Sequence, residues 1–353
     1  MIYKRLVLSA PSLVRGVVTA RKMSSGRYQV FVTRNDMPQG GIDLLKKECD
    51  VKMSTHPSTM PREDLLKAVA GVNGIFCSLT DKIDKEVLDA AGPGLKVIGT
   101  ISVGHDHIDV AECKKRGVRI GYTPDVLTDA TAELTVKNLE LRWRSFYRHH
   151  AASPEAQHEA RCGGWKSWAP TWMTGPGLAG STVGIAGFGR IGQAVARRVK
   201  AFNTKKILYF NRSERPEAQE IGAIKVSFDE LLTQSDFIIC CAALVPETKE
   251  MFNKAAFEKM KKTAIFVNTS RGGTVDQDAL IEALQNNTIR AAGLDVTTPE
   301  PLPLDNPLLK LTNCVVLPHI GSAAIETRNT MSELTANNIL TALKGEPMPA
   351  ELC

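Results

Sequence analysis

The sequence contains no apolar run near the roughly 20 residues that cross a bilayer, so we expect no membrane contact. It also lacks the paired Cys and His spacings of zinc sites, and we predict no bound metal. The net charge is +6, but no basic patch is interleaved with aromatic residues, so we expect no nucleic-acid partner. The eight cysteines are scattered, with Cys240 and Cys241 adjacent in an apolar run. This usage indicates reduced, buried thiols rather than a disulfide framework.

Acidic residues are missing from the first 35 positions, which carry Lys, Arg and Ser instead. Such a composition is typical of a mitochondrial transit peptide, although a disordered basic tail has the same composition. We expect residues 1–27 to form a disordered basic leader. The cytoplasm is the default compartment, with mitochondrial import through residues 1–25 as the alternative.

A glycine motif follows an apolar run in VGIAGFGRIG at 183–192. A strand, a Gly-x-Gly-x-x-Gly turn and a helix form the phosphate-binding unit of dinucleotide-binding domains. The glycines allow close backbone approach, and the helix N-terminus faces the pyrophosphate. We therefore predict a dinucleotide cofactor at this turn. Its predicted contacts are Gly187, Phe188, Gly189, Arg190, Ile191 and Gly192.

An acidic residue is absent where the next strand ends, although Asp or Glu normally grips the ribose 2′-hydroxyl there. The strand ends instead in Asn211, Arg212 and Ser213, within ILYFNRSERP at 207–216. Arg offers planar donors to a 2′-phosphate, which a carboxylate would repel. We predict that these residues bind NADP(H), with weaker binding of NAD(H). A solvated loop position for Arg212 is the alternative interpretation.

Short apolar runs alternate with helical patterns along most of the chain, a pattern typical of parallel sheets. The first run is YQVFVTR at 28–34, and the pattern restarts at 181 with strand, glycine turn and helix. From there six strand candidates fit a doubly wound dinucleotide-binding domain. We predict an α/β fold of two Rossmann-like domains.

Three polar residues stand at the carboxyl ends of successive strand candidates, the edge where ligands bind in such sheets. They are Arg271 in NTSRGG, Glu300 in LDVTTPEP and His319 in LPHIGSA. His moves a proton near neutral pH, and a neighbouring carboxylate orients its ring. Arg binds a carboxylate or polarises a carbonyl. We predict that these three residues are catalytic.

The chain resembles the D-isomer-specific 2-hydroxyacid dehydrogenases over most of residues 28–353. The resemblance rests on SVGHDHID (102–109), GYTPDVLTDATAEL (121–134), GGWKSW (163–168), GFGRIGQAVARR (187–198), SRGG (270–273), GLDVTTPEPLP (293–303) and LPHIGSA (317–323). It implies a substrate domain of residues 28–127 plus 320–353 and an NADP-binding domain of residues 128–319. The active site then lies in the cleft between them.

The resemblance also implies roles for residues outside the strand-end set. The backbone N–H groups of Val103 and Gly104 would bind the substrate carboxylate, and Asp295 would contact the nicotinamide carboxamide. A homodimer is implied, with much of its contact before the glycine motif. Our hypothesis is that Trp168 reaches the partner's active site and limits substrate size, and a plain packing tryptophan at the dimer contact is the alternative.

The implied activity is NADPH-dependent reduction of small 2-oxo acids, glyoxylate to glycolate and hydroxypyruvate to D-glycerate. Another dehydrogenase of the family is one alternative, and a nucleotide-sensing, non-enzymatic corepressor-like member is a second. Residues 134–161 depart from the family pattern, because Arg142, Arg144 and Arg148 stand in what is normally an apolar helix. Unpaired buried cations are costly. The segment is either a remodelled helix or the product of a misassigned splice junction, and it puts dimerisation and stability in doubt.

Overall fold

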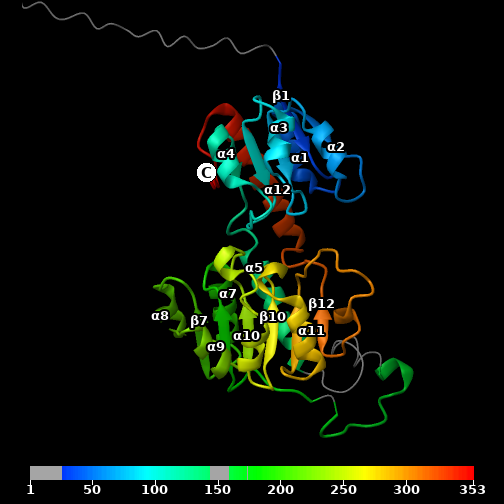
Figure 1. Ribbon diagram of the computed structural model, residues 1–353, viewed down its shortest axis with the longest axis vertical. Coiled ribbons are helices and arrows are strands. Elements are labelled where there is room, and N and C mark those ends of the chain that lie inside the picture. The colour runs from blue at the N-terminus through cyan, green and yellow to red at the C-terminus, as the bar shows by residue number, and fades with distance from the viewer. Residues whose placement is uncertain (1–25, 144–158, 173) are drawn as a thin grey trace, which may run out of the picture.

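The computed structural model describes residues 26–143, 159–172 and 174–353, with side chains left out for residues 140–143. The predicted leader, except for residues 26 and 27, and much of segment 134–161 therefore lie outside the described residues. Within the described part the chain forms two parallel sheets, drawn one above the other in Figure 1. The α/β class with two doubly wound sheets is confirmed.

The first sheet has five strands, which lie within residues 28–121. Its spatial order is β2 (Cys49–Met53), β1 (Tyr28–Val32), β3 (Gly74–Cys77), β4 (Val97–Thr100) and β5 (Arg119–Gly121). Its helices are α1 (Gln39–Glu48), α2 (Arg62–Ala68), α3 (Lys85–Ala91), α4 (Val110–Arg116) and the C-terminal α12 (Ile325–Lys344). One apolar core joins α1 and α12 to the sheet, and a second joins α2, α3 and α4, so both faces are covered.

The second sheet has seven strands, all paired in parallel. Its spatial order is β12 (Cys314–Val316), β11 (Ala291–Leu294), β10 (Ile265–Asn268), β9 (Phe237–Cys240), β6 (Thr182–Ala186), β7 (Lys206–Phe210) and β8 (Ala223–Lys225). Its helices are α5 (Thr128–Trp143), α7 (Arg190–Lys200), α8 (Glu217–Ile221), α9 (Phe228–Gln234), α10 (Lys254–Lys259) and α11 (Gln277–Gln285). Three short 3₁₀ turns complete it, η1 (Pro246–Thr248), η2 (Gly272–Thr274) and η3 (Pro307–Leu309). Helices α5, α7 and α8 cover one face, while α9, α10 and α11 cover the other.

The chain passes between the two halves before α5 and again before α12, which packs against α1, β3 and β4. The predicted domain boundaries and the ligand of each half stay predictions. The strand count of the second half differs from the expected six. The additional strand, β8, lies at the sheet edge with Ile224 and Lys225 exposed, so it carries no buried apolar run.

The described helices include none with the length and hydropathy of a membrane span. Among the described residues no cluster of three or more His, Cys, Asp or Glu side chains could hold a metal ion. The eight cysteines are free thiols, and Cys49, Cys77, Cys113 and Cys240 are buried.

Candidate active site

The three predicted catalytic residues follow three strands that are neighbours in the seven-stranded sheet. Arg271 follows β10, Glu300 follows β11 and His319 follows β12. Because the strands are parallel, their carboxyl ends share one edge of the sheet. The topology therefore brings residues far apart in sequence to the same side of the domain.

His319 and Glu300 form a hydrogen-bonded pair, with 2.8 Å between Nδ1 of His319 and Oε2 of Glu300. The backbone N–H of Thr297 donates to the other carboxylate oxygen at 3.1 Å. Burial works to raise the pKa of Glu300, but the bond from His319 and the amide of Thr297 together hold it below its usual value. Glu300 is therefore ionised at neutral pH and holds the His319 ring with Nε2 left for another partner.

Asp295 fixes the backbone of the loop that carries His319. Its two carboxylate oxygens accept the N–H groups of Ile320 at 2.8 Å and Gly321 at 2.7 Å. Its own carbonyl accepts the N–H of His319 at 2.9 Å. Burial raises the pKa of this Asp, although the two amide donors oppose the shift. His319 has a positive φ of 55°, which this loop enforces. The predicted contact of Asp295 with the nicotinamide stays a prediction.

Arg271 reaches from the seven-stranded half to the loop after β4 of the five-stranded half. Its Nε donates to Oδ1 of Asp106 at 2.9 Å, and its Nη1 donates to the Ser270 carbonyl at 2.9 Å. A Cβ at Gly104 would lie 1.9 Å from Nη2 of Arg271, so only glycine leaves room for this approach. Asp106 was missed by the sequence analysis, which treated its motif only as a source of backbone N–H groups.

The loop of residues 100–107 is held by a chain of hydrogen bonds. The Ser102 hydroxyl donates to the Gly104 carbonyl at 2.7 Å. The Thr100 hydroxyl lies 2.8 Å from Ser102 Oγ, and His107 Nε2 lies 3.0 Å from Thr100 Oγ1. Since Ser102 uses its proton on Gly104, Thr100 must donate to Ser102 and His107 must donate to Thr100. This direction fixes the His107 tautomer and the conformation of the Val103–Gly104 turn.

A pocket of about 980 Å³ opens beside the turn between β6 and α7. Gly187 has φ of 91°, and a Cβ there would lie 2.5 Å from the backbone N of Ala242. A Cβ at Gly192 would lie 2.2 Å from the carbonyl oxygen of Gly187. Both positions therefore require glycine, which permits the tight turn that cradles a pyrophosphate. The residues present fit a dinucleotide.

The other residues of this turn divide between the pocket and the core. Gly189, Arg190 and Ile191 line the pocket, and Arg190 forms an ion pair with Asp125. Phe188 is buried and stacks on Tyr209, with ring centroids 4.2 Å apart. Phe188 therefore supports the turn from below, and only its backbone can face a ligand.

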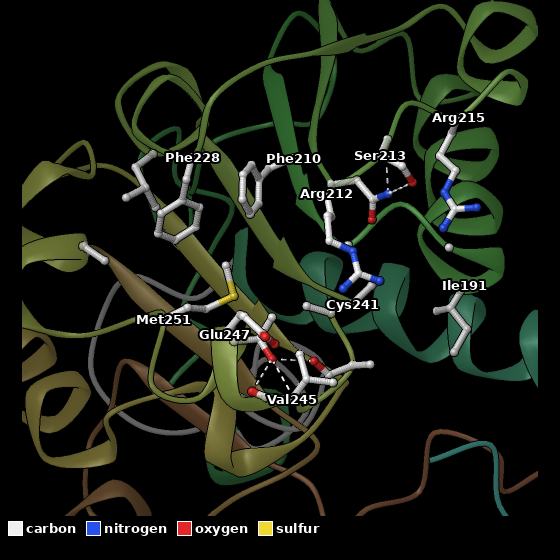
Figure 2. A pocket seen from close by; sticks show the side chains of 18 of the residues that line it. Ile191, Phe210, Arg212, Ser213, Arg215, Phe228, Cys241, Val245, Glu247 and Met251 are labelled. Atoms are coloured by element: carbon white, nitrogen blue, oxygen red, sulfur yellow. Dashed lines mark hydrogen bonds between the residues drawn. The ribbon is translucent and has the colours of Figure 1, made fainter. Parts of the chain in front are cut away.

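The residues after β7 line the same pocket. Asn211 accepts the Phe188 N–H at 3.3 Å and donates to the Ser213 carbonyl at 2.9 Å, so it joins this loop to the glycine turn. Figure 2 shows Arg212 and Arg215 on either side of Ser213, and all three line the pocket. Arg215 was not among the predicted cofactor contacts. With Arg212 it gives the ribose end of the pocket two guanidinium groups, which favours a phosphate ligand.

Trp168 is 82% exposed, and Trp165 is 61% exposed in the same GGWKSW segment. Large apolar side chains exposed together are typical of interaction surfaces. The predicted place of Trp168 at a partner's active site stays a prediction.

The chain has two halves, each built on a parallel sheet, and a glycine turn beside a pocket of about 980 Å³. These features are typical of dinucleotide-binding enzymes. The family described as "D-isomer specific 2-hydroxyacid dehydrogenase, NAD binding domain" matches residues 145–321. The glyoxylate reductase/hydroxypyruvate reductase of Homo sapiens is 53% identical over 92% of this chain and 97% of its own length. The glyoxylate reductase of Thermofilum pendens is 44% identical over 92% of this chain and 94% of its own.

Solved structures agree with this assignment. A protein of Thermus thermophilus superposes with a TM-score of 0.82 and 40% identity, covering 92% of this chain and 100% of the other. An NADPH-dependent glyoxylate/hydroxypyruvate reductase of Sinorhizobium meliloti, in complex with NADP and malonate, gives a TM-score of 0.79 at 29% identity. That comparison covers 93% of this chain and 97% of the other. The chain belongs to the D-isomer-specific 2-hydroxyacid dehydrogenase family.

Proposed function

We propose that this protein reduces glyoxylate to glycolate and hydroxypyruvate to D-glycerate with NADPH. The observation that carries the proposal is the hydrogen bond of 2.8 Å between His319 and Glu300. These two residues and Arg271 follow three neighbouring strands, so they lie at the same edge of the sheet. The likeness to reductases named for these two substrates supports the choice of 2-oxo acid.

In this proposal the substrate carboxylate is bound by Arg271 and by the backbone N–H groups of Val103 and Gly104. The close packing of Gly104 on Arg271 supports a shared binding position. Arg271 also polarises the C2 carbonyl, so it acts both in the ground state and in the transition state.

The bound cofactor supplies the hydride that reduces C2. His319 donates its proton from Nε2 to the C2 oxygen as negative charge develops there. Glu300, already ionised and bonded to Nδ1, stabilises the imidazolium before the transfer and orients the ring throughout. Proton transfer leaves His319 neutral, and solvent restores its proton before the next turnover.

The preference for NADPH rests on Arg212, Ser213 and Asn211 at the end of β7, where a carboxylate is absent. Arg215 lines the same part of the pocket. Two guanidinium groups attract the 2′-phosphate of NADPH, while NADH offers only a hydroxyl at that position. NADH should bind more weakly.

A homodimer is part of the proposal, and the exposed tryptophans of segment 163–168 support a contact there. Trp168 would then lie at the partner's active site. A non-enzymatic, nucleotide-sensing role is the alternative class of function.

A steady-state assay of NADPH oxidation with glyoxylate and hydroxypyruvate tests the proposal. NADH, and a phosphorylated 2-oxo acid, are the comparison cofactor and substrate. We expect turnover of both small oxo acids with a lower KM for NADPH than for NADH. Nucleotide binding without turnover would contradict the enzymatic function, and preference for the phosphorylated acid would assign another dehydrogenase activity.

A further inference from the structure

The ion pair between Asp106 and Arg271 joins the two halves of the molecule. Asp106 lies in the loop after β4, and Arg271 lies in the loop after β10 of the other sheet. The side chains are only partly exposed, at 34% for Asp106 and 20% for Arg271. The Asp106 carboxylate therefore lies beside Arg271, which is the proposed binding group for the substrate carboxylate. A second negative charge at such a position would by itself weaken the binding of an anionic substrate.

The geometry of the pair explains how a carboxylate can assist there. Asp106 takes the Nε–H of Arg271, and the Ser270 carbonyl takes an N–H of Nη1. An arginine has five N–H donors in one plane, so these two bonds fix the plane of the guanidinium. Nη2 then lies against Gly104, whose backbone N–H is one of the proposed donors to the substrate carboxylate.

Asp106 is itself held by anchors on both sides in the sequence. The Ser102 hydroxyl bonds the Gly104 carbonyl on one side, and His107 bonds Thr100 on the other. Burial works to raise the pKa of Asp106, but the charge of Arg271 and its hydrogen bond hold it below the usual value. The Asp106 carboxylate is therefore ionised and fixed in place at neutral pH.

Arg271 also has a second carboxylate nearby, because Arg271 and Glu300 follow the neighbouring strands β10 and β11, and the charge of Arg271 contributes to lowering the pKa of Glu300. Glu300 is the hydrogen-bond partner of His319. An Arg271 side chain released from Asp106 would be drawn toward Glu300 and would compete with His319 for it. The bond to Asp106 thus holds Arg271 against the loop of the five-stranded half.

We propose that Asp106 is a positioning residue that aims Arg271 at the substrate carboxylate and keeps it away from Glu300. This inference rests on the proposed function, since it assumes that Arg271 binds the 2-oxo acid. Asp106 itself touches no substrate in this scheme. Its effect on catalysis must therefore pass through Arg271.

A double-mutant cycle tests this dependence. The variants are Asp106→Ala, Asp106→Asn, Arg271→Ala and both Asp106 substitutions combined with Arg271→Ala. Asp89→Ala is the matched control, because it breaks another carboxylate–guanidinium contact of 2.6 Å, to Arg116, in the same half of the molecule. For each full-length protein we would measure kcat/KM for glyoxylate, NADPH affinity by fluorescence titration, and Tm.

We expect Asp106→Ala to lower kcat/KM about tenfold to a hundredfold, as for loss of a charge-assisted hydrogen bond, with NADPH affinity unchanged. Asp106→Asn should lower kcat/KM less, since its amide oxygen can still accept the Nε–H. If Asp106→Ala does not fold, Asp106→Asn is used for the comparison instead. In the Arg271→Ala background both losses should vanish. A folded Asp106→Ala protein within twofold of the Asp89→Ala control, or an undiminished loss in the Arg271→Ala background, would overturn the inference. Absence of activity in the unmodified protein would instead reject the proposed function.

Discussion

Glu300 is kept ionised by its neighbours, and its charge determines what His319 can do. The pKa of Glu300 lies below its usual value, so the carboxylate stays charged until the pH falls well into the acid range. The ionised carboxylate lies 2.8 Å from Nδ1 and orients the ring, with Nε2 left for the substrate. His319 can therefore serve as the acid in reduction and as the base in the reverse reaction.

The first prediction concerns His319→Ala. Loss of the proton donor should lower kcat for glyoxylate reduction about a hundredfold or more. NADPH affinity should change little, because His319 is absent from the residues that line the dinucleotide pocket. Stopped-flow turnover and fluorescence titration would measure the two effects separately. Turnover equal to that of the unmodified enzyme would remove His319 from the mechanism.

The second prediction concerns Arg212→Ala. The variant should raise KM for NADPH by about tenfold to a hundredfold, as expected for a lost charge-assisted hydrogen bond of about 1.5–3 kcal/mol. KM for NADH should remain nearly unchanged, since NADH has no 2′-phosphate. Arg197→Ala, an exposed arginine of α7, is the control. Equal losses with both cofactors would show that Arg212 does not contact the phosphate.

The positions of Arg271, Glu300 and His319 at strand ends could be predicted from the sequence. The contact that Arg271 makes with the other half of the molecule could not. Arg271 and Glu300 follow the apolar runs of the buried strands β10 and β11, and His319 follows the apolar run of the half-buried edge strand β12. Asp106 pairs with Arg271 across 165 positions, and no local pattern encodes that contact. In the sequence only its place beside the Val103–Gly104 turn points to Asp106.

Among the elements, helix α5 overlaps the segment 134–161, which departs from the family pattern. It packs on α7, β10 and β11, so its inner face is buried in the seven-stranded half. Thr135 on that face bonds the hydroxyl of Thr269 at 2.8 Å. Asn138, also on that face, is 1% exposed, and neither its amide nitrogen nor its amide oxygen has a partner among the described residues. The described part of segment 134–161 thus holds a buried amide that has no hydrogen-bond partner among the described residues.

The third prediction follows from that buried amide. Asn138→Leu should raise Tm, because it removes a buried amide whose desolvation costs about 1–3 kcal/mol and adds buried apolar surface. Lys137→Leu is the control, since it places the same side chain on the exposed face of α5. Thermal unfolding of the three proteins gives the comparison. A lower Tm for Asn138→Leu would show that the amide finds a partner beyond the described residues.

Strand prediction succeeded where a strand is buried on both faces and failed at the edge strands β2 and β8, although the edge strand β12 was recognised from its apolar run. β6, β9 and β10 are almost continuously apolar, which marks them in the sequence. The edge strands β2 and β8 expose alternate or successive residues and were not recognised. Edge strands receive their conformation from the neighbouring strand, not from their own composition.

At the scale of the whole molecule, the glycine turn after β6 and the loop of residues 100–107 pack against the same apolar core. Ile191 of the glycine turn packs against the core of the five-stranded half, beside which Val103 also lies. Val103 and Ile191 both line the dinucleotide pocket. Together with the Asp106–Arg271 pair, these contacts place residues of both halves of the chain around the proposed active site. Each half on its own would lack part of the site.

The loop that makes this connection should also set part of the acid stability of the molecule. Burial is the main cause that lowers the pKa of His107 to about 4, with Arg271 and His105 acting in the same direction and Asp106 opposing them. In the unfolded chain its pKa is about 6.5. Between these values the unfolded state binds more protons, so His107 supports stability above about pH 6.5, and this support is lost as the pH falls toward 4.

The fourth prediction uses His107→Gln, whose side-chain amide can still donate to Thr100 but does not titrate. Between about pH 7.5 and about pH 5 the unmodified protein should lose up to about 2 kcal/mol more of its free energy of unfolding than the variant. This value is an upper limit, because the ring as a whole is only partly buried although its Nδ1 is shielded from solvent and has no partner in the described structure. Urea unfolding at both pH values, followed by tryptophan fluorescence, measures the difference. Parallel losses in the two proteins would mean that His107 is protonated in the folded state with little penalty, and the hydrogen-bond chain to Gly104 would then not depend on a neutral ring.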